Sequence, residues 1–176
     1  MYGTSAFNLK QWIDENRHLL KPPVGNKMVW QDSDLMVMIV GGPNLRKDYH
    51  INPTEEFYYQ IEGDMVLKVI VGGQKHDVSI KAGDIYLLPA QTPHSPQRPA
   101  GTVGMVIERR RPEGQEDHIR WYCDNCGEIL YDPSFYLTNL ATQIKPVIEE
   151  FFSREDLRTC KKCGTVMPTP PPAPAK

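Results

Sequence analysis

Hydrophobic and polar positions follow two different periods along the chain. A helical period covers residues 8–20, where the apolar side chains share one stripe: Leu9, Trp12, Ile13, Leu19 and Leu20. Asn8 and Gln11 have the spacing of a capping box, and Pro22-Pro23 follows the last apolar pair. The pattern therefore predicts one amphipathic helix near the N-terminus.

From about residue 27 to residue 111 the pattern is typical of β-strands. The predicted strands are residues 35–40, 56–61, 65–71, 76–80, 85–88 and 103–108. Gly, Pro and Asp lie between them, and Gly72-Gly73 is a hairpin signal. No helical crossover separates the strands, which disfavours a parallel α/β fold. Short strands at regular spacing indicate an all-β sandwich or small barrel.

The pattern changes after Pro112-Glu113-Gly114, and residues 118–164 carry all four cysteines. Residues 144–152 could form a short helix, which Pro146 interrupts early. Residues 168–176 are Pro-rich and predict an extended tail, either without a function or as a ligand for a proline-recognising domain. We divide the chain into a barrel with its helix, a C-terminal metal-binding region and a tail: residues 1–114, 115–166 and 167–176.

Composition adds mainly exclusions. The chain has 176 residues, 40% hydrophobic and 24% charged, and a formal net charge of −2, so neither a nucleic-acid nor an anionic-membrane surface is expected. The basic run Arg109-Arg110-Arg111 is interpreted as a solvated strand end, with a localisation signal as the alternative. No apolar run approaches the roughly 20 residues of a membrane span. Two Cys-x2-Cys pairs and the lack of a secretory signal favour the cytosol.

The chemistry begins with two spaced motifs, His50-x5-Glu56-x6-Gly63 and Gly83-x5-Pro89-x4-His94. This spacing resembles the two motifs of the cupin β-barrel, in which His50, Glu56 and His94 would bind a metal. Two imidazoles and a carboxylate leave open positions, as non-heme Fe(II) oxygenases require.

Two neighbouring carboxylates complicate this assignment. Glu55 competes with Glu56, but adjacent strand residues face opposite sides, and the family spacing selects Glu56. Many cupins have a further histidine where this chain has Asp48, which leaves three protein ligands. Asp48 shares the strand parity of His50, so it either orients a ligand imidazole or Arg46, or serves as a turn residue.

Three further charged residues fit a substrate site. Arg98 follows His94 by four residues and Arg46 precedes His50 by four, so each shares a face with a ligand in extended chain. A guanidinium beside a metal favours an anion, and its fork matches a carboxylate. Glu108 ends an apolar strand and, facing inward, would accept a proton or a hydrogen bond from substrate. The alternative for all three is an exposed charge at a strand end.

The cysteines form a second metal motif, Cys123-x2-Cys126 and Cys160-x2-Cys163. Paired knuckles of this kind bind one tetrahedral ion, zinc or rubredoxin-type iron, through four thiolates. Such a closed shell indicates a structural or electron-transferring site, and a redox dithiol is the alternative.

Longer matches identify a more specific resemblance, to the 3-hydroxyanthranilate 3,4-dioxygenase family. The matching segments are Lys21–Asn26, Val40–Asn44, Arg46–His50, Glu55–Gln60, Leu87–Pro89, His94–Pro99, Glu108–Pro112 and Trp121–Cys123. The resemblance runs from about residue 8 to residue 164, and the cysteine knuckles are similar to those of bacterial and fungal members.

The resemblance implies an extradiol ring-opening enzyme of tryptophan catabolism, on the route to quinolinate and NAD. The substrate, 3-hydroxyanthranilate, would chelate Fe(II) through its amino and hydroxyl groups, O2 would be the co-substrate, and the product would be 2-amino-3-carboxymuconate semialdehyde. Arg46 and Arg98 would hold the carboxylate and Glu108 would take a proton. Asn26 and Phe57 match positions near the family's substrate pocket, and the family expectation is a homodimer.

Three other functions remain open at this point. A cupin dioxygenase for another small aromatic acid would keep the triad and alter the pocket. A thiol dioxygenase would use three histidines, which the glutamate at position 56 disfavours. A non-catalytic sugar- or storage-type cupin would need neither the triad nor two inward arginines.

Overall fold

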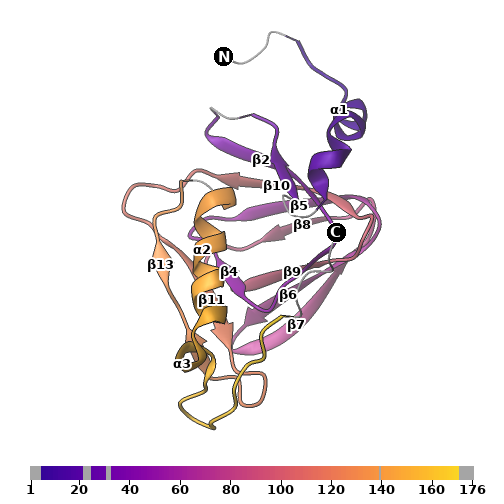
Figure 1. Ribbon diagram of the computed structural model, residues 1–176. Coiled ribbons are helices and arrows are strands. Elements are labelled where there is room, and N and C mark those ends of the chain that lie inside the picture. The colour runs from indigo at the N-terminus through magenta and orange to yellow at the C-terminus, as the bar shows by residue number, and fades with distance from the viewer. Residues whose placement is uncertain (1–4, 22–24, 31–32, 139, 171–176) are drawn as a thin grey trace.

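Two antiparallel sheets face each other and enclose the interior of the chain (Figure 1). The computed structural model describes residues 5–21, 25–30, 33–138 and 140–170. Pro22-Pro23, predicted to end the first helix, and residues 171–176 of the predicted tail lie outside the described residues. The all-β barrel predicted from the spacing of short strands is confirmed.

The first sheet has the strand order β1-β2-β10-β5-β8. Its strands are β1 Asn26–Met28, β2 Leu35–Gly41, β10 Val103–Arg109, β5 Glu56–Glu62 and β8 Ile85–Leu88. The second sheet has the order β12-β11-β4-β9-β6-β7, with β13 beside β11 and β3 beside β9. Its strands are β3 Asn44–Leu45, β4 Tyr49–Ile51, β6 Met65–Val71, β7 Gln74–Ile80, β9 His94–Arg98, β11 Asp117–Tyr122, β12 Ile129–Tyr131 and β13 Ser134–Phe135.

The six predicted strands are all present, and the strands missed by the pattern are short or polar. β9, for example, reads His-Ser-Pro-Gln-Arg and shows no apolar alternation. It forms because its neighbours β4 and β6 pair with it on either side. Pairing with other strands, rather than local propensity, thus creates the strand that carries His94.

The barrel core consists of apolar side chains that point inward from both sheets: Met38, Tyr58, Met65, Leu67, Val69, Ile80, Leu88 and Val106. Their burial follows the period of two expected for half-buried strands, as in β6, where Met65, Leu67 and Val69 are buried. Burial of this apolar surface is the main stabilising contribution to the barrel.

The N-terminal helix is shorter than predicted. α1 spans Leu9–Asn16, and a 3₁₀ turn, η1, continues from Arg17 to Leu20. The Asn8 side chain accepts a hydrogen bond from the Gln11 amide at 2.9 Å, but the Gln11 side chain donates to Glu15. Half of the predicted capping box therefore forms. The helix through Ile13, and the 3₁₀ turn through Leu20, pack on the outer face of β2 and β10.

The C-terminal part joins the second sheet directly. β11 pairs with β4 of the barrel. The predicted boundary at residue 114 therefore separates two parts of the chain that share one sheet. α2 (Leu140–Ser153) begins earlier than the predicted helix and retains Pro146 inside it, and α3 (Glu155–Arg158) follows. α2 lies over β11 (Figure 1). The two elements are joined by the ring of Phe151, which stacks on that of Trp121 with centroids 4.2 Å apart.

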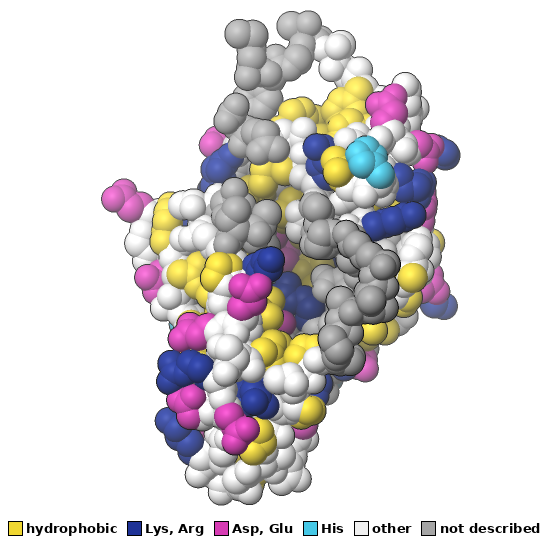
Figure 2. Space-filling view, in the orientation of Figure 1, with side chains coloured by type: hydrophobic (Ala, Val, Ile, Leu, Met, Phe, Trp, Pro, Cys, Tyr) yellow, Lys and Arg dark blue, Asp and Glu magenta, His cyan; other side chains and the backbone are white. Residues whose placement is uncertain are grey.

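Charged side chains of both signs are interspersed on the face shown in Figure 2. Among the described residues, no helix combines the length and the apolar character needed to cross a membrane.

Candidate functional site

Three strands bring His50, Glu56 and His94 together inside the barrel. His50 of β4 and His94 of β9 are direct cross-strand partners, and Glu56 approaches them from β5 in the other sheet. One ligand atom of each lies within 4.8 Å of the others, and all three side chains are buried. Glu55, the competing carboxylate, is exposed. The spacing of the two motifs therefore translates into one compact donor set.

Hydrogen bonds fix which nitrogen of each imidazole faces the cluster. His50 donates from Nε2 to Asp117 Oδ2 at 2.6 Å, and His94 donates from Nδ1 to the Thr92 carbonyl at 3.0 Å. His50 Nδ1 and His94 Nε2 then carry the lone pairs, and they lie 3.5 and 3.3 Å from Glu56 Oε1. Two lone pairs and a carboxylate oxygen converging on one point fit a divalent metal ion.

Burial and mutual attraction set the charges of this cluster. Burial alone would raise the pKa of Glu56, but the adjacent His94 and His50 hold the pKa well below its usual range. Burial lowers the pKa of His50, whereas the Glu56 carboxylate outweighs burial and raises the pKa of His94. The carboxylate is thus ionised, as a metal ligand must be.

Both oxygens of Glu56 are held by neighbouring donors. Tyr58 donates to Oε2 at 2.7 Å, and the Asn52 amide donates to Oε1 at 3.0 Å. Asn52 Oδ1 accepts from the amide and the hydroxyl of Thr54, which turns its NH₂ group toward the carboxylates. The same NH₂ group donates to Glu108 Oε2 at 3.0 Å. Asn52 therefore links the ligand carboxylate to Glu108.

Asp48 is an ion-pair partner and not part of the donor set. Its carboxylate accepts hydrogen bonds from Arg46 through both oxygens. Burial lowers the pKa of Arg46, but Asp48 outweighs burial and the net pKa is raised. Of the two roles considered for Asp48, the structure shows the orientation of Arg46.

Arg98 is a buried cation for which no ion pair with a carboxylate is seen in the part of the chain that the structure describes. Its side chain donates to Gln60 at 2.9 Å, while Nε has no hydrogen-bond partner among the described residues. Burial lowers the pKa of Arg98 to about 10. Gly104 makes room for it, because a Cβ at that position would lie 2.6 Å from Arg98 Nη1. A buried guanidinium of this kind is stabilised by an anion that enters the pocket.

Glu108 is a buried carboxyl group whose pKa is raised, whereas that of Arg98 is lowered. Burial, followed by repulsion from Glu56, raises its pKa to about 8, although Arg111 pairs with it at 2.8 Å and opposes the shift. A group with this pKa holds or releases a proton near neutral pH, which is the requirement for general acid–base catalysis.

A cavity of about 90 Å³ connects these groups. Its lining residues are Asn26, Met38, Val40, Asn44, Arg46, His50, Glu56, Tyr58, His94, Pro96, Arg98, Val106 and Glu108. The structure thus brings the predicted Asn26, Arg46, Arg98 and Glu108 to the predicted metal ligands. The two arginines and Glu108 are not exposed strand-end charges, which was their alternative interpretation.

Phe57 requires a correction, because it does not line this cavity. It alternates with Glu56 and Tyr58 in β5, so its side chain lies on the outer face of the sheet. There it stands opposite Ile107 and Leu87. The aromatic residue that faces the metal ligands is Tyr58, and its strand parity with Glu56 was the signal that could have identified it.

The basic run at the end of β10 requires a second correction. Arg111 is not solvated: its side chain is 0% exposed and it donates to both oxygens of Asp117 at 2.6 Å. Sequence reasoning also missed Asp117 and Asn52. Asp117 lies 67 residues from His50, its hydrogen-bond partner, and no local pattern marks such a contact.

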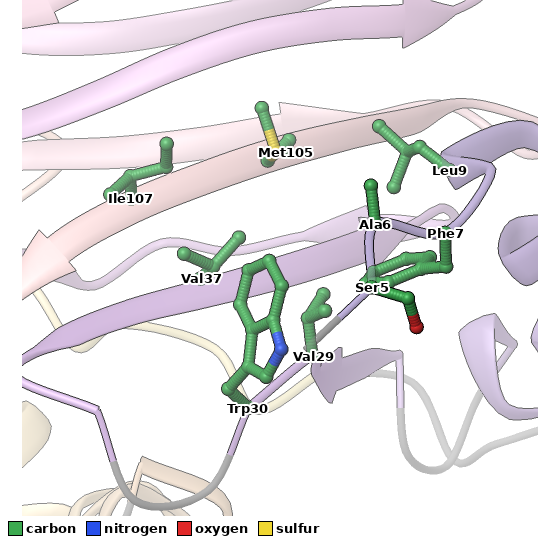
Figure 3. Close-up of a pocket in the computed structure, with 9 residues that line it drawn as sticks. All are labelled: Ser5, Ala6, Phe7, Leu9, Val29, Trp30, Val37, Met105 and Ile107. Carbon is green, nitrogen blue, oxygen red and sulfur yellow. The ribbon is translucent and has the colours of Figure 1, made fainter. Parts of the chain in front are cut away.

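A larger cavity, of about 580 Å³, lies on the outer face of the first sheet (Figure 3). Its described lining residues are Ser5, Ala6, Phe7, Leu9, Val29, Trp30, Val37, Met105 and Ile107. None of these side chains titrates, so the lining offers no acid, base or metal ligand.

The four cysteines form a second cluster at the far end of β11. Cys123 and Cys163 lie 3.6 Å apart at Sγ, Cys126 and Cys160 lie 3.5 Å apart, and one ligand atom of each falls within 4.8 Å of the others. Each Cys-x2-Cys pair forms the same turn, in which Gly127 or Gly164 at φ 74° donates to the first cysteine carbonyl. Four sulfur atoms at the corners of one site fit a tetrahedral metal ion.

The sequence matches a known protein family. Residues 1–152 match the family described as 3-hydroxyanthranilic acid dioxygenase. The 3-hydroxyanthranilate 3,4-dioxygenase of Jannaschia sp. (strain CCS1) is 57% identical over 96% of this chain and 94% of its own length. That of Neurospora crassa is 53% identical over 93% of this chain and 90% of its own length.

A solved structure supports the barrel alone. Hydroquinone 1,2-dioxygenase from Sphingomonas sp. TTNP3 with 4-hydroxybenzoate bound has a TM-score of 0.50 and 21% identity. The match covers 62% of this chain and 33% of that one. At this identity the likeness concerns the fold.

Proposed function

The chain belongs to the 3-hydroxyanthranilic acid dioxygenase family, and from this premise we propose that it cleaves 3-hydroxyanthranilate with O2. His50, Glu56 and His94 would hold the Fe(II). One observation carries the proposal beyond the family name: a three-donor metal set shares a cavity with the undercompensated cation Arg98 and the acid Glu108. A metal, a carboxylate receptor and a proton acceptor are what this substrate needs.

The substrate's three functional groups fit three parts of the cavity. Its amino and phenol groups would face the metal ligands, and Fe(II) bound there would lower the phenol pKa and admit O2 beside the ring. Arg98 and Arg46 would bind the carboxylate. Arg98 offers the more favourable interaction, because Arg46 already pairs with Asp48.

Glu108 would accept the phenol proton. Its raised pKa makes it basic enough to take a proton from a phenol acidified by the metal. Asn52 and Arg111 both contact Oε2 of Glu108, so this carboxylate is held in one orientation at the cavity wall. Asn26 and Tyr58 complete the wall around the ring.

The product would be 2-amino-3-carboxymuconate semialdehyde, which closes to quinolinate without an enzyme and feeds NAD synthesis. The paired thiolate turns would bind a second iron or a zinc with a structural role, because four cysteines close the coordination shell. Reduced thiolates of this kind also favour the cytosol as the working compartment.

We also propose a homodimer that forms through the outer face of the first sheet. Four apolar side chains cross that face in register, on neighbouring strands: Val37, Ile107, Phe57 and Leu87. Leu87 and Ile85 are more than half exposed, although both lie on a sheet. An apolar row of this kind favours association with a second copy. Leu87→Arg should shift the mass in solution toward the monomer, whereas Leu45→Arg, on exposed β3, should not.

The activity is tested by loading the protein with Fe(II) without oxygen and then measuring O2 uptake. One O2 consumed per 3-hydroxyanthranilate, with the absorbance of the semialdehyde, is expected. 3-Hydroxybenzoate, which keeps the carboxylate and the hydroxyl in their positions but lacks the amine, serves as the control and should not be cleaved. Turnover of another aromatic acid without turnover of 3-hydroxyanthranilate would reject the proposal.

A further inference from the structure

We infer that Arg111 is a positioning residue that fixes the proposed metal ligand His50 and the acid Glu108 relative to each other. The inference deepens the proposed function and rests on it. Arg111 lies outside the cavity lining, so it would act only through the residues that it contacts.

A single guanidinium makes all of these contacts. Arg111 Nε and Nη2 donate to Oδ1 and Oδ2 of Asp117, both at 2.6 Å. Nη2 also lies 2.8 Å from Glu108 Oε2, and Nη1 donates to the Arg109 carbonyl at 3.0 Å. The planar fork therefore fixes two carboxylates relative to each other, which no other cationic side chain does with the same geometry.

One branch of this network reaches the metal site through Asp117. Asp117 Oδ2 accepts from His50 Nε2 at 2.6 Å, which turns His50 Nδ1 toward Glu56. The backbone supports the same arrangement, because Ile119 of β11 is the cross-strand partner of His50. A carboxylate that orients a ligand imidazole commonly changes metal affinity by about 10- to 100-fold.

The other branch reaches Glu108. Arg111 and Asn52 both contact Oε2, which leaves Oε1 to meet the substrate proton. Glu108 is 4% exposed and Asp117 is 0% exposed, so each would lose a buried cationic partner without Arg111. Loss of the guanidinium should therefore disturb the ligand His50 and the proton acceptor at once.

The decisive variant is Arg111→Lys, which keeps a positive charge but cannot span both carboxylates. Arg109→Lys is the matched control, because it belongs to the same basic run but lies exposed at the end of β10. The expected result is Fe(II) affinity weakened by about 10- to 100-fold, measured by competition with a chelator. At saturating iron, kcat should remain reduced while KM for substrate changes little.

Asp117→Asn separates the two branches. It should weaken Fe(II) affinity like Arg111→Lys, yet keep most of kcat when iron saturates. The double variant Arg111→Lys/Asp117→Asn should bind Fe(II) no more weakly than either single variant, because both changes interrupt one path. Thermal unfolding of each variant checks the fold. If Arg111→Lys does not fold, the Fe(II) affinity of Asp117→Asn decides, and an unchanged value overturns the inference.

Failure of the inference is distinguishable from failure of the proposed function. If wild type cleaves 3-hydroxyanthranilate and Arg111→Lys matches Arg109→Lys in Fe(II) affinity and kcat, only the inference is overturned. If wild type neither binds Fe(II) at His50, Glu56 and His94 nor consumes O2, both are overturned.

Discussion

The two candidate metal sites of this chain are built in opposite ways. His50, Glu56 and His94 come from three strands in two sheets, and His50 is oriented by Asp117, which lies 67 residues away in sequence. The cysteines come from two tight turns that repeat one local backbone pattern. A site with three donors inside a rigid barrel keeps room for reactants, whereas four thiolates on paired turns close around their ion.

The surroundings differ as much as the ligands. The barrel cluster lies beside a buried cation and a buried acid whose pKa values, about 10 and about 8, both depart from the ordinary ones. Around the cysteines it is a thiol whose pKa departs from the ordinary value: hydrogen bonds with Thr165 lower the pKa of Cys163 to about 5. Perturbed groups that face a cavity indicate catalysis, and perturbed thiols that face one another indicate metal binding.

The largest effect is expected from removing a barrel ligand. Glu56→Ala should abolish iron binding at the barrel and ring cleavage, because two imidazoles alone hold Fe(II) poorly in the protein. The matched control Glu55→Ala changes an exposed neighbour and should retain both. Iron content and O2 uptake are the measurements. Ring cleavage by Glu56→Ala with unchanged iron content would contradict the assignment of Glu56 as a ligand of the open barrel site.

The next effect should follow from Glu108→Gln. The amide preserves size but cannot accept the phenol proton, so kcat should fall by about 10²- to 10⁴-fold. Barrel iron should remain, because Glu108 is not a ligand. A parallel loss of iron would show instead that Glu108 belongs to the metal cluster.

Arg98→Ala should produce an intermediate effect that depends on the ligand. A charge-assisted hydrogen bond contributes about 1.5–3 kcal/mol, or roughly 10- to 100-fold in the affinity for 3-hydroxyanthranilate. Affinity for 2-aminophenol, which lacks the carboxylate, should change little or improve, because an undercompensated buried cation is removed. Anaerobic titration of the Fe(II) enzyme measures both. Equal losses would place Arg98 in the fold or the metal site rather than at the carboxylate.

A smaller effect concerns the pH dependence of the metal-free protein. The pKa of Glu108 rises from 4.5 to about 8 on folding, so its protonated form is favoured in the native state. The unfolded chain loses this proton first, and the resulting stability is present at low pH and declines between about pH 4 and pH 9. Glu108→Gln removes this pH-dependent contribution to stability. The melting temperature of the variant should therefore rise by a few degrees relative to that of wild type as the pH increases through this window.

The smallest effect on turnover is expected at the cysteines. Cys123→Ser should lose the second metal and several degrees of thermal stability, yet retain kcat within about twofold per iron-loaded molecule, since a closed shell offers no place for substrate. Metal analysis, thermal unfolding and O2 uptake test this together. A folded Cys123→Ser protein with full barrel iron and no activity would move an electron-transfer role ahead of the structural one.

The sequence predicted the parts of the fold and site that local patterns encode. Short apolar runs bounded by turn residues identified β2 and β6, and motif spacing identified His50, Glu56 and His94. β9 escaped because pairing with its neighbours creates it. Arg111 and Asp117 escaped because burial of opposite charges is decided by tertiary contacts, which a basic run beside a proline does not reveal.

Phe57 shows the limit of transferring a site from motif resemblance. A one-residue offset in a strand moves a side chain to the other face, and here it separates the cavity wall from the outer apolar row. Strand parity counted from Glu56 would have selected Tyr58. At this position, the alternation of side chains along the strand therefore predicts the cavity wall better than the motif resemblance does.

β11 limits how this protein can be shortened. The strand begins at Asp117, which orients His50, and Cys123 follows directly after its last residue, Tyr122. A truncation at residue 114 would remove the cysteine turns and, with them, the hydrogen-bond partner of a metal ligand. An engineer who wants a minimal catalyst must keep residues 117–122 or supply another strand beside β4. The C-terminal region therefore cannot be removed or replaced independently of the barrel, because its strand β11 is part of the second sheet.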